Sequence, residues 1–254
     1  MSALDRRGAA HGPRGARRAR VLALPAALSL GLSLLAGCLM RVTQPERVDD
    51  PVTAYLTDYG YHASVLLPRE DGQLSEFAFG QWDWFALNHN QWYHALGIVL
   101  LPSGGTLGTR VVTPPRPART LERTPGVAPA PDAPSRGDLA ALDDFAAALW
   151  CQRVWPLRVE RSRAAGLRDR LQAEYDAARH TEVYNPQVRL TLVRSDKLYW
   201  HHQNCNTVVA QWLEALGCEV TGARGEAEFD VKAGPRWSLD FVSSAPGEAR
   251  YSKH

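Results

Sequence analysis

The sequence predicts an α+β fold, in which a small antiparallel sheet packs against helices. Two stretches of alternating apolar residues flank Asp71-Gly72, a dipeptide typical of β-hairpin turns. Three later stretches, which begin near Asp138, Arg163 and Asn204, repeat apolar residues at helical spacing. The 254 residues allow one large domain or two small ones.

The first 37 residues carry the features of an export signal. A segment with six arginines precedes an apolar run at 21–36, which is too short to favour a spanning helix. The sequence LAGC at 35–38 resembles the bacterial lipobox. This resemblance implies cleavage before Cys38 and a diacylglycerol on its thiol. Because Leu39 is not acidic, we expect the outer membrane, facing the periplasm, in a cell with two membranes.

The charge is divided unevenly along the chain. The first 37 residues have a net charge of +5 and the whole chain has +2, so the remainder has −3. A mildly acidic protein offers no electrostatic basis for binding nucleic acid. We expect its partners to be the membrane, through Cys38, and a substrate in the cell envelope.

The rest of the chain is expected to form one domain. Residues 38–52 are polar and contain two prolines, which predicts a tether, and the domain fills 53–254. A stretch rich in Pro, Ala and Arg at about 113–137 predicts a surface insertion.

The first elements are expected to be strands at 53–70 and 75–84. Alternation places His62, Ser64 and Leu66 on one face of the first arm. In the second arm Glu76 shares a face with its neighbours at positions 78 and 80, and the two faces could coincide. Residues 81–94, dense in aromatics and amides, suit a loop or short helix that lines a cleft or forms an aromatic core.

The later elements are a buried strand closed by a turn, its hairpin partner, two helices, a strand and a final helix. They are expected at 95–105, 106–112, 138–155, 163–180, 187–193 and 204–216. Gly217 ends the final helix, and Asn204 or Asn206 could cap its start.

Cys205 lies at the start of that final helix. The positive end of the helix dipole and the free N–H groups of the first turn both favour a thiolate there. The alternative is a half-buried cysteine that only packs. Cys205 and Cys218 lie about 18–20 Å apart along a regular helix, too far to bridge. A Cys151–Cys218 disulfide remains open, which would leave Cys205 free.

A cysteine nucleophile needs a base, and the base needs a residue that orients it. His62 is the best candidate for the base, because the pKa of histidine lies near neutral. Glu76, on the next strand, is expected to orient the imidazole. Asp83 and Gln81 are the alternatives for this role.

The oxyanion hole of such a site could combine the backbone N–H of Cys205 with the side chain of Gln203 or Asn204. A competing hypothesis is a metal site in which one of the histidines of His201-His202 and Cys205 bind zinc with His89 and His94. No second pair has standard ligand spacing, so we expect neither a metal nor a cofactor.

The order of a strand histidine, a polar residue on the next strand and a late cysteine at a helix start resembles circularly permuted papain-like enzymes. These include the permuted NlpC-like peptidases and the lecithin–retinol acyltransferase-like proteins. More narrowly, GYHASVLLP, EFAFGQWDW and NCNTVVAQWLEALG look like the bacterial domain of unknown function 2459. Asn204 and Val208 replace a Thr and a Trp of that family, and Gly80-Gln81-Trp82-Asp83 stands where Gly-Asp is expected.

The resemblance implies a Cys–His–polar triad on a permuted papain-like fold. We therefore expect an envelope-anchored cysteine hydrolase (a peptidase or amidase) or an acyltransferase. Cys205 would attack an amide or ester carbonyl, His62 would act as base and then acid, and Glu76 would orient His62. Peptidoglycan peptides and lipid or lipoprotein acyl groups suit this location. The alternative is a non-catalytic lipoprotein that binds or scaffolds an envelope component.

Overall fold

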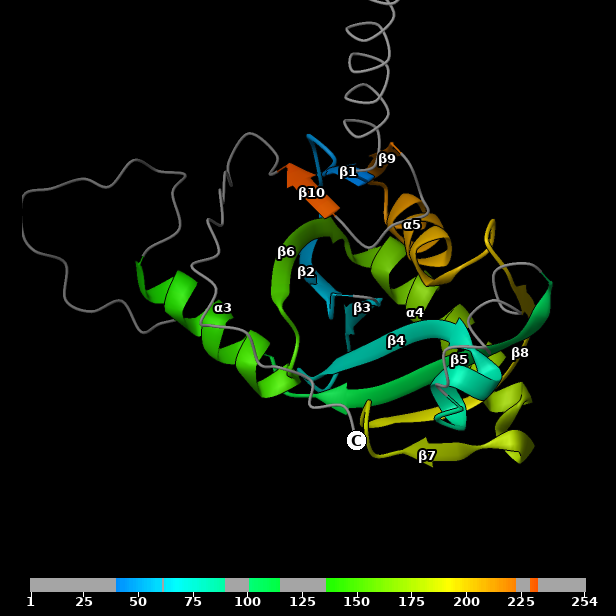
Figure 1. Ribbon diagram of the computed structural model, residues 1–254. Coiled ribbons are helices and arrows are strands. Elements are labelled where there is room, and N and C mark those ends of the chain that lie inside the picture. Colours follow the sequence, from blue (N-terminus) through cyan, green and yellow to red (C-terminus); the bar gives the residue numbers. More distant parts are fainter. Residues whose placement is uncertain (1–39, 61, 90–100, 115–135, 223–228, 233–254) are drawn as a thin grey trace, which may run out of the picture. The chain divides into compact units, whose positions relative to one another are not determined.

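The computed structural model in Figure 1 describes residues 40–60, 62–89, 101–114, 136–222 and 229–232. The chain divides into two compact units, Met1–Cys38 and Leu39–His254, and every described residue belongs to the second. The expected signal, the Cys38 lipidation site and most of the expected insertion lie outside the described residues. No helix in the described part of the chain has both the length and the apolar character needed to cross a bilayer.

Seven strands form one antiparallel sheet in the order β6-β2-β3-β4-β5-β8-β7. They are β2 (Pro51–Asp58), β3 (Ala63–Pro68), β4 (Leu74–Gln81), β5 (Ser103–Val112), β6 (Arg153–Glu160), β7 (Val183–Asn185) and β8 (Leu190–Tyr199). The α+β class is confirmed, but the antiparallel sheet is larger than the small one expected.

A second sheet has three strands in the order β10-β1-β9, namely β1 (Met40–Thr43), β9 (Glu219–Thr221) and β10 (Phe229–Lys232). This sheet changes the expected boundary of the domain, because β1 lies within the segment predicted as a tether, 38–52. Met40 and Val42 are fully buried, so the segment expected as a tether already contains packed structure at Met40. Alternating Met40 and Val42 were the signal for this short strand.

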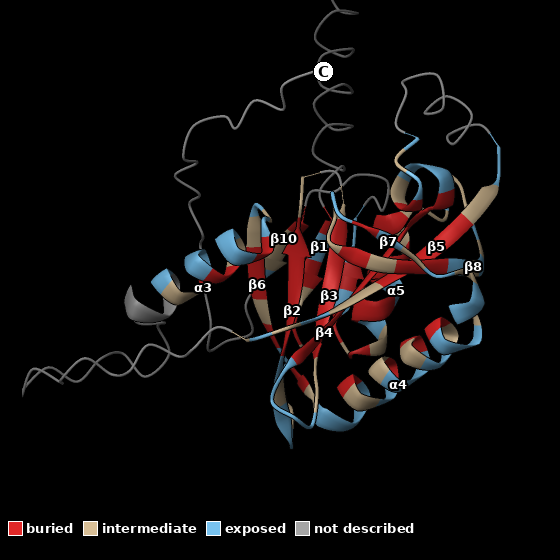
Figure 2. Cartoon of the chain, turned by 90° about the horizontal axis from the view of Figure 1, so that it is seen from below, coloured by how far each residue is buried: buried red, intermediate tan, exposed pale blue. Residues whose placement is uncertain are grey.

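The helices are α3 (Arg136–Leu149), α4 (Arg161–Ala177) and α5 (Cys205–Ala215), with a π-helix η1 (Trp82–Ala86) and a 3₁₀ turn η2 (Arg179–Thr181). Side chains of α4 and α5 form the main core with one face of the large sheet. Side chains of α3 and η1 pack on the strand residues that alternate with those of the main core. Because successive side chains of a strand point to opposite faces, α3 and η1 cover the other face of the large sheet. Figure 2 shows the buried central strands and the exposed outer sides of α3 and α4.

The hairpin predicted around Asp71-Gly72 is confirmed, with β3 and β4 as its arms and Gly72 at a φ of 76°. Ser64 pairs with Ala78 and Leu66 with Glu76, so these side chains share one face as expected. The residues between them in sequence, including Val65 and Phe77, face α4 and α5.

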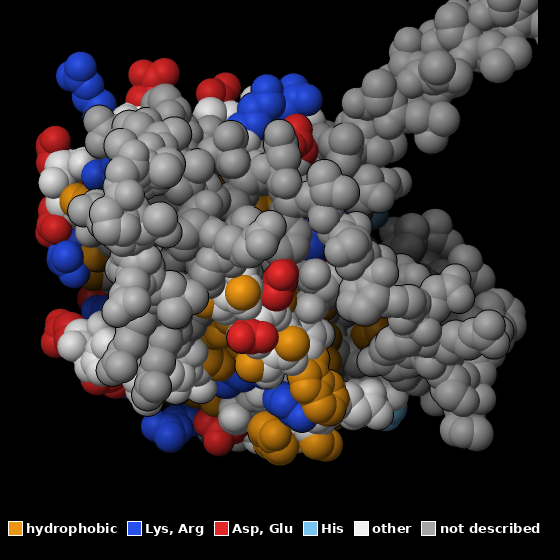
Figure 3. Space-filling view, turned by 90° about the vertical axis from the view of Figure 1, so that its left-hand side faces the viewer, with side chains coloured by type: hydrophobic (Ala, Val, Ile, Leu, Met, Phe, Trp, Pro, Cys, Tyr) orange, Lys and Arg blue, Asp and Glu red, His pale blue; other side chains and the backbone are white. Residues whose placement is uncertain are grey.

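The predicted helix at 138–155 ends earlier than expected. Leu142, Phe145 and Leu149 are buried on one side of α3, as predicted, but Trp150 adopts a φ of 62°, which ends the helix. Residues 153–160 then pair with β2 as an edge strand. On this side of the domain, exposed hydrophobic side chains lie among charged ones (Figure 3). Trp150 itself is exposed, and its ring lies under the Arg189 guanidinium, 3.5 Å from the ring centroid.

Two other predicted boundaries also differ. Gly104 and Gly105 lie within β5, paired with β8, and do not form the expected turn. The chain of β8 runs so close to Gly105 that a Cβ there would meet the Lys197 carbonyl oxygen at 2.2 Å. The strand expected at 187–193 runs from Leu190 to Tyr199, after a turn in which Arg189 has a φ of 55°. Helix α4 lies at 161–177, close to the expected 163–180.

Candidate functional site

The first turn of α5 is fixed by Asn204, one of the two expected caps. Its Oδ1 accepts hydrogen bonds from the Thr207 backbone N–H at 2.9 Å and from the Thr207 hydroxyl at 3.2 Å. Its Nδ2 donates to the His201 carbonyl at 3.3 Å. The Asn204 amide thus holds the helix start together, a role different from the oxyanion donor considered for it.

The thiol of Cys205 is buried, with 6% of the residue exposed, and it lies among hydrogen-bond donors. Burial raises the pKa of the thiol, whereas the Tyr199 hydroxyl and the backbone N–H groups of Asn206, Cys205 and Ala63 act in the opposite direction. The four donors come from three different elements, β8, α5 and β3. The sulfur itself lies 3.6 Å from the Asn206 Oδ1.

The other two described cysteines differ from Cys205. Burial raises the pKa of the Cys218 thiol to about 12, and burial together with the charge of Glu76 raises the pKa of Cys151 to about 12. Cys151 and Cys218 are both free thiols, so the open disulfide is not formed. They pack in separate clusters on the two faces of the large sheet.

His62 stands at the end of a tight turn between β2 and β3. The Tyr59 N–H donates to the His62 carbonyl at 2.8 Å, and the Gly60 N–H donates to the Asp58 carboxylate at 2.7 Å. Gly60 has a φ of 91°, which favours glycine. Asp58 is fully buried and pairs with Arg153 at 2.6 Å. The turn before His62 is therefore held by the buried Asp58 carboxylate.

The His62 imidazole packs against Phe85, with the ring centroids 4.5 Å apart. Its Nε2 is buried and has no hydrogen-bond partner in the described part of the chain. Burial lowers the pKa of His62 to about 4, so the ring is neutral at neutral pH. A buried polar atom without a partner is uncommon and destabilising.

The structure places the backbone of the residue after His62 beside the Cys205 thiol, whereas the His62 ring contacts Phe85. The thiol of Cys205 receives a hydrogen bond from Ala63, the residue directly after His62. The Ala63 side chain belongs to the core with α5, whereas Phe85 packs with Ala78 on the opposite face. The His62 ring, which packs against Phe85, therefore lies towards the face that carries η1.

The Glu76 carboxylate, which was expected to orient His62, has three other partners in this structure. Its Oε2 pairs with Arg110 Nε at 2.5 Å, and its Oε1 accepts from the Tyr59 hydroxyl at 2.6 Å and from Ser64 Oγ at 2.5 Å. The reason is the register of β4 and β5, which sets Arg110 directly opposite Glu76. The carboxylate is 1% exposed and needs a cation beside it.

Gln81 and Asp83, the alternatives to Glu76, interact with each other instead. Gln81 caps η1, because its Oε1 accepts from the Trp84 N–H at 2.5 Å, and its Nε2 donates to Asp83 at 3.2 Å. Gln203, the other oxyanion candidate, forms backbone hydrogen bonds with Trp200 across the turn before α5.

Two histidines of the metal hypothesis, His201 and His202, lie on that same turn, whereas His89 follows η1 and its backbone N–H donates to the Asp83 carbonyl at 2.9 Å. His201 and His202 are exposed and stack with ring centroids 3.8 Å apart, beside Trp200. Within the described residues, no three His, Cys, Asp or Glu side chains converge as a metal site. His94 lies outside the described residues.

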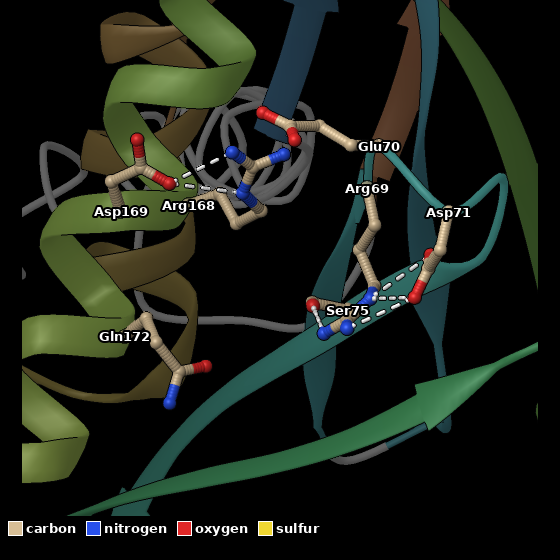
Figure 4. Close-up of a pocket in the computed structure, with 7 residues that line it drawn as sticks. All are labelled: Arg69, Glu70, Asp71, Ser75, Arg168, Asp169 and Gln172. Atoms are coloured by element: carbon tan, nitrogen blue, oxygen red, sulfur yellow. Dashed lines mark hydrogen bonds and ion pairs between the residues drawn. The ribbon is translucent and has the colours of Figure 1, made fainter.

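One cleft of about 560 Å³ lies elsewhere, between the β3–β4 turn and α4 (Figure 4). Its arginines are already paired: Arg69 with Asp71 at 3.0 Å, and Arg168 with Asp169 at 2.9 Å. The turn follows the far end of β3 from His62, so this cleft is separate from Cys205.

Sequence reasoning missed Tyr199, whose hydroxyl lies at the Cys205 thiol, and Arg110, which pairs with Glu76. Tyr199 reaches the thiol because the chain reverses at Trp200–Gln203, so that the end of β8 meets the start of α5. The alternation of β8 gives no sign of that reversal. Comparisons of this chain with protein-family models, with curated proteins and with solved structures find no match.

Proposed function

We propose that this chain is an exported, lipid-anchored cysteine hydrolase or acyltransferase with a permuted papain-like fold. The observation that carries the proposal is the group of donors around the Cys205 sulfur: the Tyr199 hydroxyl and the backbone N–H groups of Cys205, Asn206 and Ala63. Donors of this kind stabilise a thiolate and, later, an oxyanion. The Cys218 pKa is shifted by burial alone, as a packing cysteine requires.

In the proposed reaction the Cys205 sulfur attacks the carbonyl carbon of an amide or ester, and His62 accepts the thiol proton. The tetrahedral intermediate collapses to a thioester as the C–N or C–O bond breaks, and His62 returns the proton to the leaving amine or alcohol. Water or a second nucleophile then cleaves the thioester. The proposal uses a Cys–His pair without an acidic third residue, because Glu76 pairs with Arg110.

The proposed reaction requires the His62 ring to turn from Phe85 towards the thiol. This rotation of the ring breaks no hydrogen bond of Nε2, because Nε2 has no partner among the described residues. Release from burial raises the imidazole pKa from about 4 towards its ordinary range, where it can accept a proton. The Tyr199 hydroxyl takes the oxyanion role considered for the side chain of Gln203 or Asn204, beside the expected backbone N–H of Cys205.

A non-catalytic lipoprotein is the second candidate, and one observation favours it. The Cys205 thiol is buried with a raised pKa, and the neutral His62 ring stacks on Phe85, so the pair is not charged in this structure. In a non-catalytic lipoprotein the His62 ring would stay against Phe85 and would not rotate towards the thiol.

The two candidates differ in the reactivity of Cys205. In the full chain, the rate of iodoacetamide labelling at Cys205, resolved by mass spectrometry from that at Cys218 and Cys151, should fall at least tenfold in His62→Ala. The matched control His89→Ala should keep the rate of the unchanged protein. Equal rates in both variants would exclude His62 as the activating base.

The substrate class is tested with the full chain and its Cys205→Ser variant. Each is incubated with purified peptidoglycan sacculi and with acylated lipopeptides. The proposal is supported if only the unchanged protein acts. Release of peptides from sacculi then indicates the peptidoglycan class, and loss or transfer of the acyl group of the lipopeptides indicates the acyl class. Binding without turnover, equal in both forms, supports the non-catalytic alternative.

A further inference from the structure

The three-stranded sheet begins almost directly after the expected lipidation site. Only Leu39 separates Cys38 from Met40, whose side chain is fully buried. Two residue steps of an extended chain cover at most about 7 Å. A lipid on Cys38 would therefore hold this sheet at the membrane surface, with no spacer between them.

The outer face of this sheet is polar and its charges balance. Alternate residues, among them Met40, Val42 and Phe229, face the core, which leaves their neighbours on the outer side. The outer side chains are Arg41, Thr43, Glu219, Thr221, Asp230 and Lys232. Arg41 pairs with Asp230 at 3.2 Å. Because charged groups are costly to move into an apolar medium, a face with two basic and two acidic groups can lie against polar headgroups but does not enter the hydrocarbon.

We propose that the outer face of the β10-β1-β9 sheet is the membrane-contact surface of this protein. The inference rests on lipidation of Cys38, which is part of the proposed function. It goes further, because it fixes which side of the domain meets the headgroups. Phe229 packs against Trp155 of β6, so the small sheet lies at the β6 edge of the large sheet.

This placement also limits the position of the proposed nucleophile. Helix α5 ends next to β9 and begins at Cys205, and its 11 residues span about 16 Å. Figure 1 shows the small sheet and α5 at the same end of the described domain. Cys205 therefore lies within about one helix length of the contact surface, which favours substrates presented close to the headgroups.

The experiment places one reporter lysine near the proposed surface and one far from it. Thr221→Lys is on β9, opposite Arg41, and Tyr184→Lys is on β7, at the other edge of the large sheet. Six strand spacings of about 4.8 Å separate β6 from β7, or about 29 Å. Both positions are exposed. Each full-length variant is reconstituted, after processing, in phosphatidylcholine vesicles that contain a lipid with an amine-reactive headgroup.

We expect at least ten times more lipid adduct at position 221 than at position 184, with the native Lys197 as internal standard. Insertion of 12 Gly and Ser residues after Leu39, with a mean span of about 20 Å, should reduce the ratio to within about twofold. Equal adducts without the insertion, or more at 184, would overturn the contact surface.

A mature Cys38 that carries no lipid would overturn this inference and the anchoring half of the proposed function together. The catalytic half is judged separately, by Cys205 labelling in His62→Ala, so failure of the membrane surface and failure of catalysis give different results.

Discussion

The two faces of the seven-stranded sheet are stabilised in different ways. The face covered by α4 and α5 is built from apolar side chains such as Val65, Leu67 and Phe77, all fully buried. The opposite face also buries Ser64 and Glu76, between the cluster under α3 and the cluster under η1. The first face depends on volume and apolar area, whereas the second depends on complete pairing of its polar atoms.

This difference explains the state of the two candidate residues. Cys205 belongs to the apolar face, so its thiol is desolvated and depends on four nearby donors. The His62 ring belongs to the polar face, yet its Nε2, like the Nε1 of Trp82, has no hydrogen-bond partner among the described residues. His62 and Ala63 are adjacent at the start of β3, but the Ala63 side chain packs in the core with α5 and the His62 ring packs against Phe85 on the other face.

The apolar face should show the largest single effect. Phe77→Ala removes a fully buried ring from the core and is expected to lower the free energy of unfolding by about 3–5 kcal/mol, because the cavity cannot fully collapse. Urea unfolding followed by circular dichroism measures this. Val111→Ala, at a side chain that is 50% exposed, is the control and should stay within about 0.5 kcal/mol. A loss below 1 kcal/mol for Phe77→Ala would contradict the close packing.

The polar face should respond to pairing and not to volume. Arg110→Met leaves the Glu76 carboxylate buried without its cation and is expected to cost about 3–4 kcal/mol in urea unfolding. The double variant Arg110→Met, Glu76→Leu removes both charges and should recover most of that loss. If the double variant is as unstable as Arg110→Met alone, the ion pair is not what holds this face together.

The unpartnered imidazole makes stability depend on pH. The unfolded chain binds a proton on His62 below about pH 6.5, whereas the folded protein binds it only below about pH 4. Stability is therefore lost as the pH falls from about 6.5 to about 4, by about 3 kcal/mol in total. His62→Gln removes this dependence, and other titrating groups cancel in the comparison. Parallel pH curves of unfolding free energy for the two proteins would show that the ring is not buried and neutral.

Much of the fold could be predicted from periodicity. The β3–β4 hairpin, the buried side of α3, the extent of α4 and the start of α5 follow from local patterns in the sequence. The edge strand β6 was hidden because residues 150–155 continue a helical pattern. Only the pairing of Arg153–Glu160 with β2 decides their conformation.

The site was less predictable for a related reason. Sequence spacing correctly placed Glu76 on the face of Ser64, but the partner of a carboxylate depends on the register of the next strand. Arg110 lies 34 residues after Glu76 and stands directly opposite it. In the same way, no local pattern tells which face of the sheet α5 covers, and that choice separates the His62 ring from Cys205.

The smallest effect is expected at the cap of α5, on the apolar face. Asn204→Ala removes the acceptor of the Thr207 N–H and should lower the free energy of unfolding by about 1 kcal/mol, whereas Asn204→Ser keeps an acceptor and should lose less. The two variants also separate capping from a role in catalysis. If Asn204 acts only through the helix start, Asn204→Ser keeps the iodoacetamide rate at Cys205. A fall as large as that in His62→Ala would assign the Asn204 amide to the reacting site, as one reading of the sequence suggested.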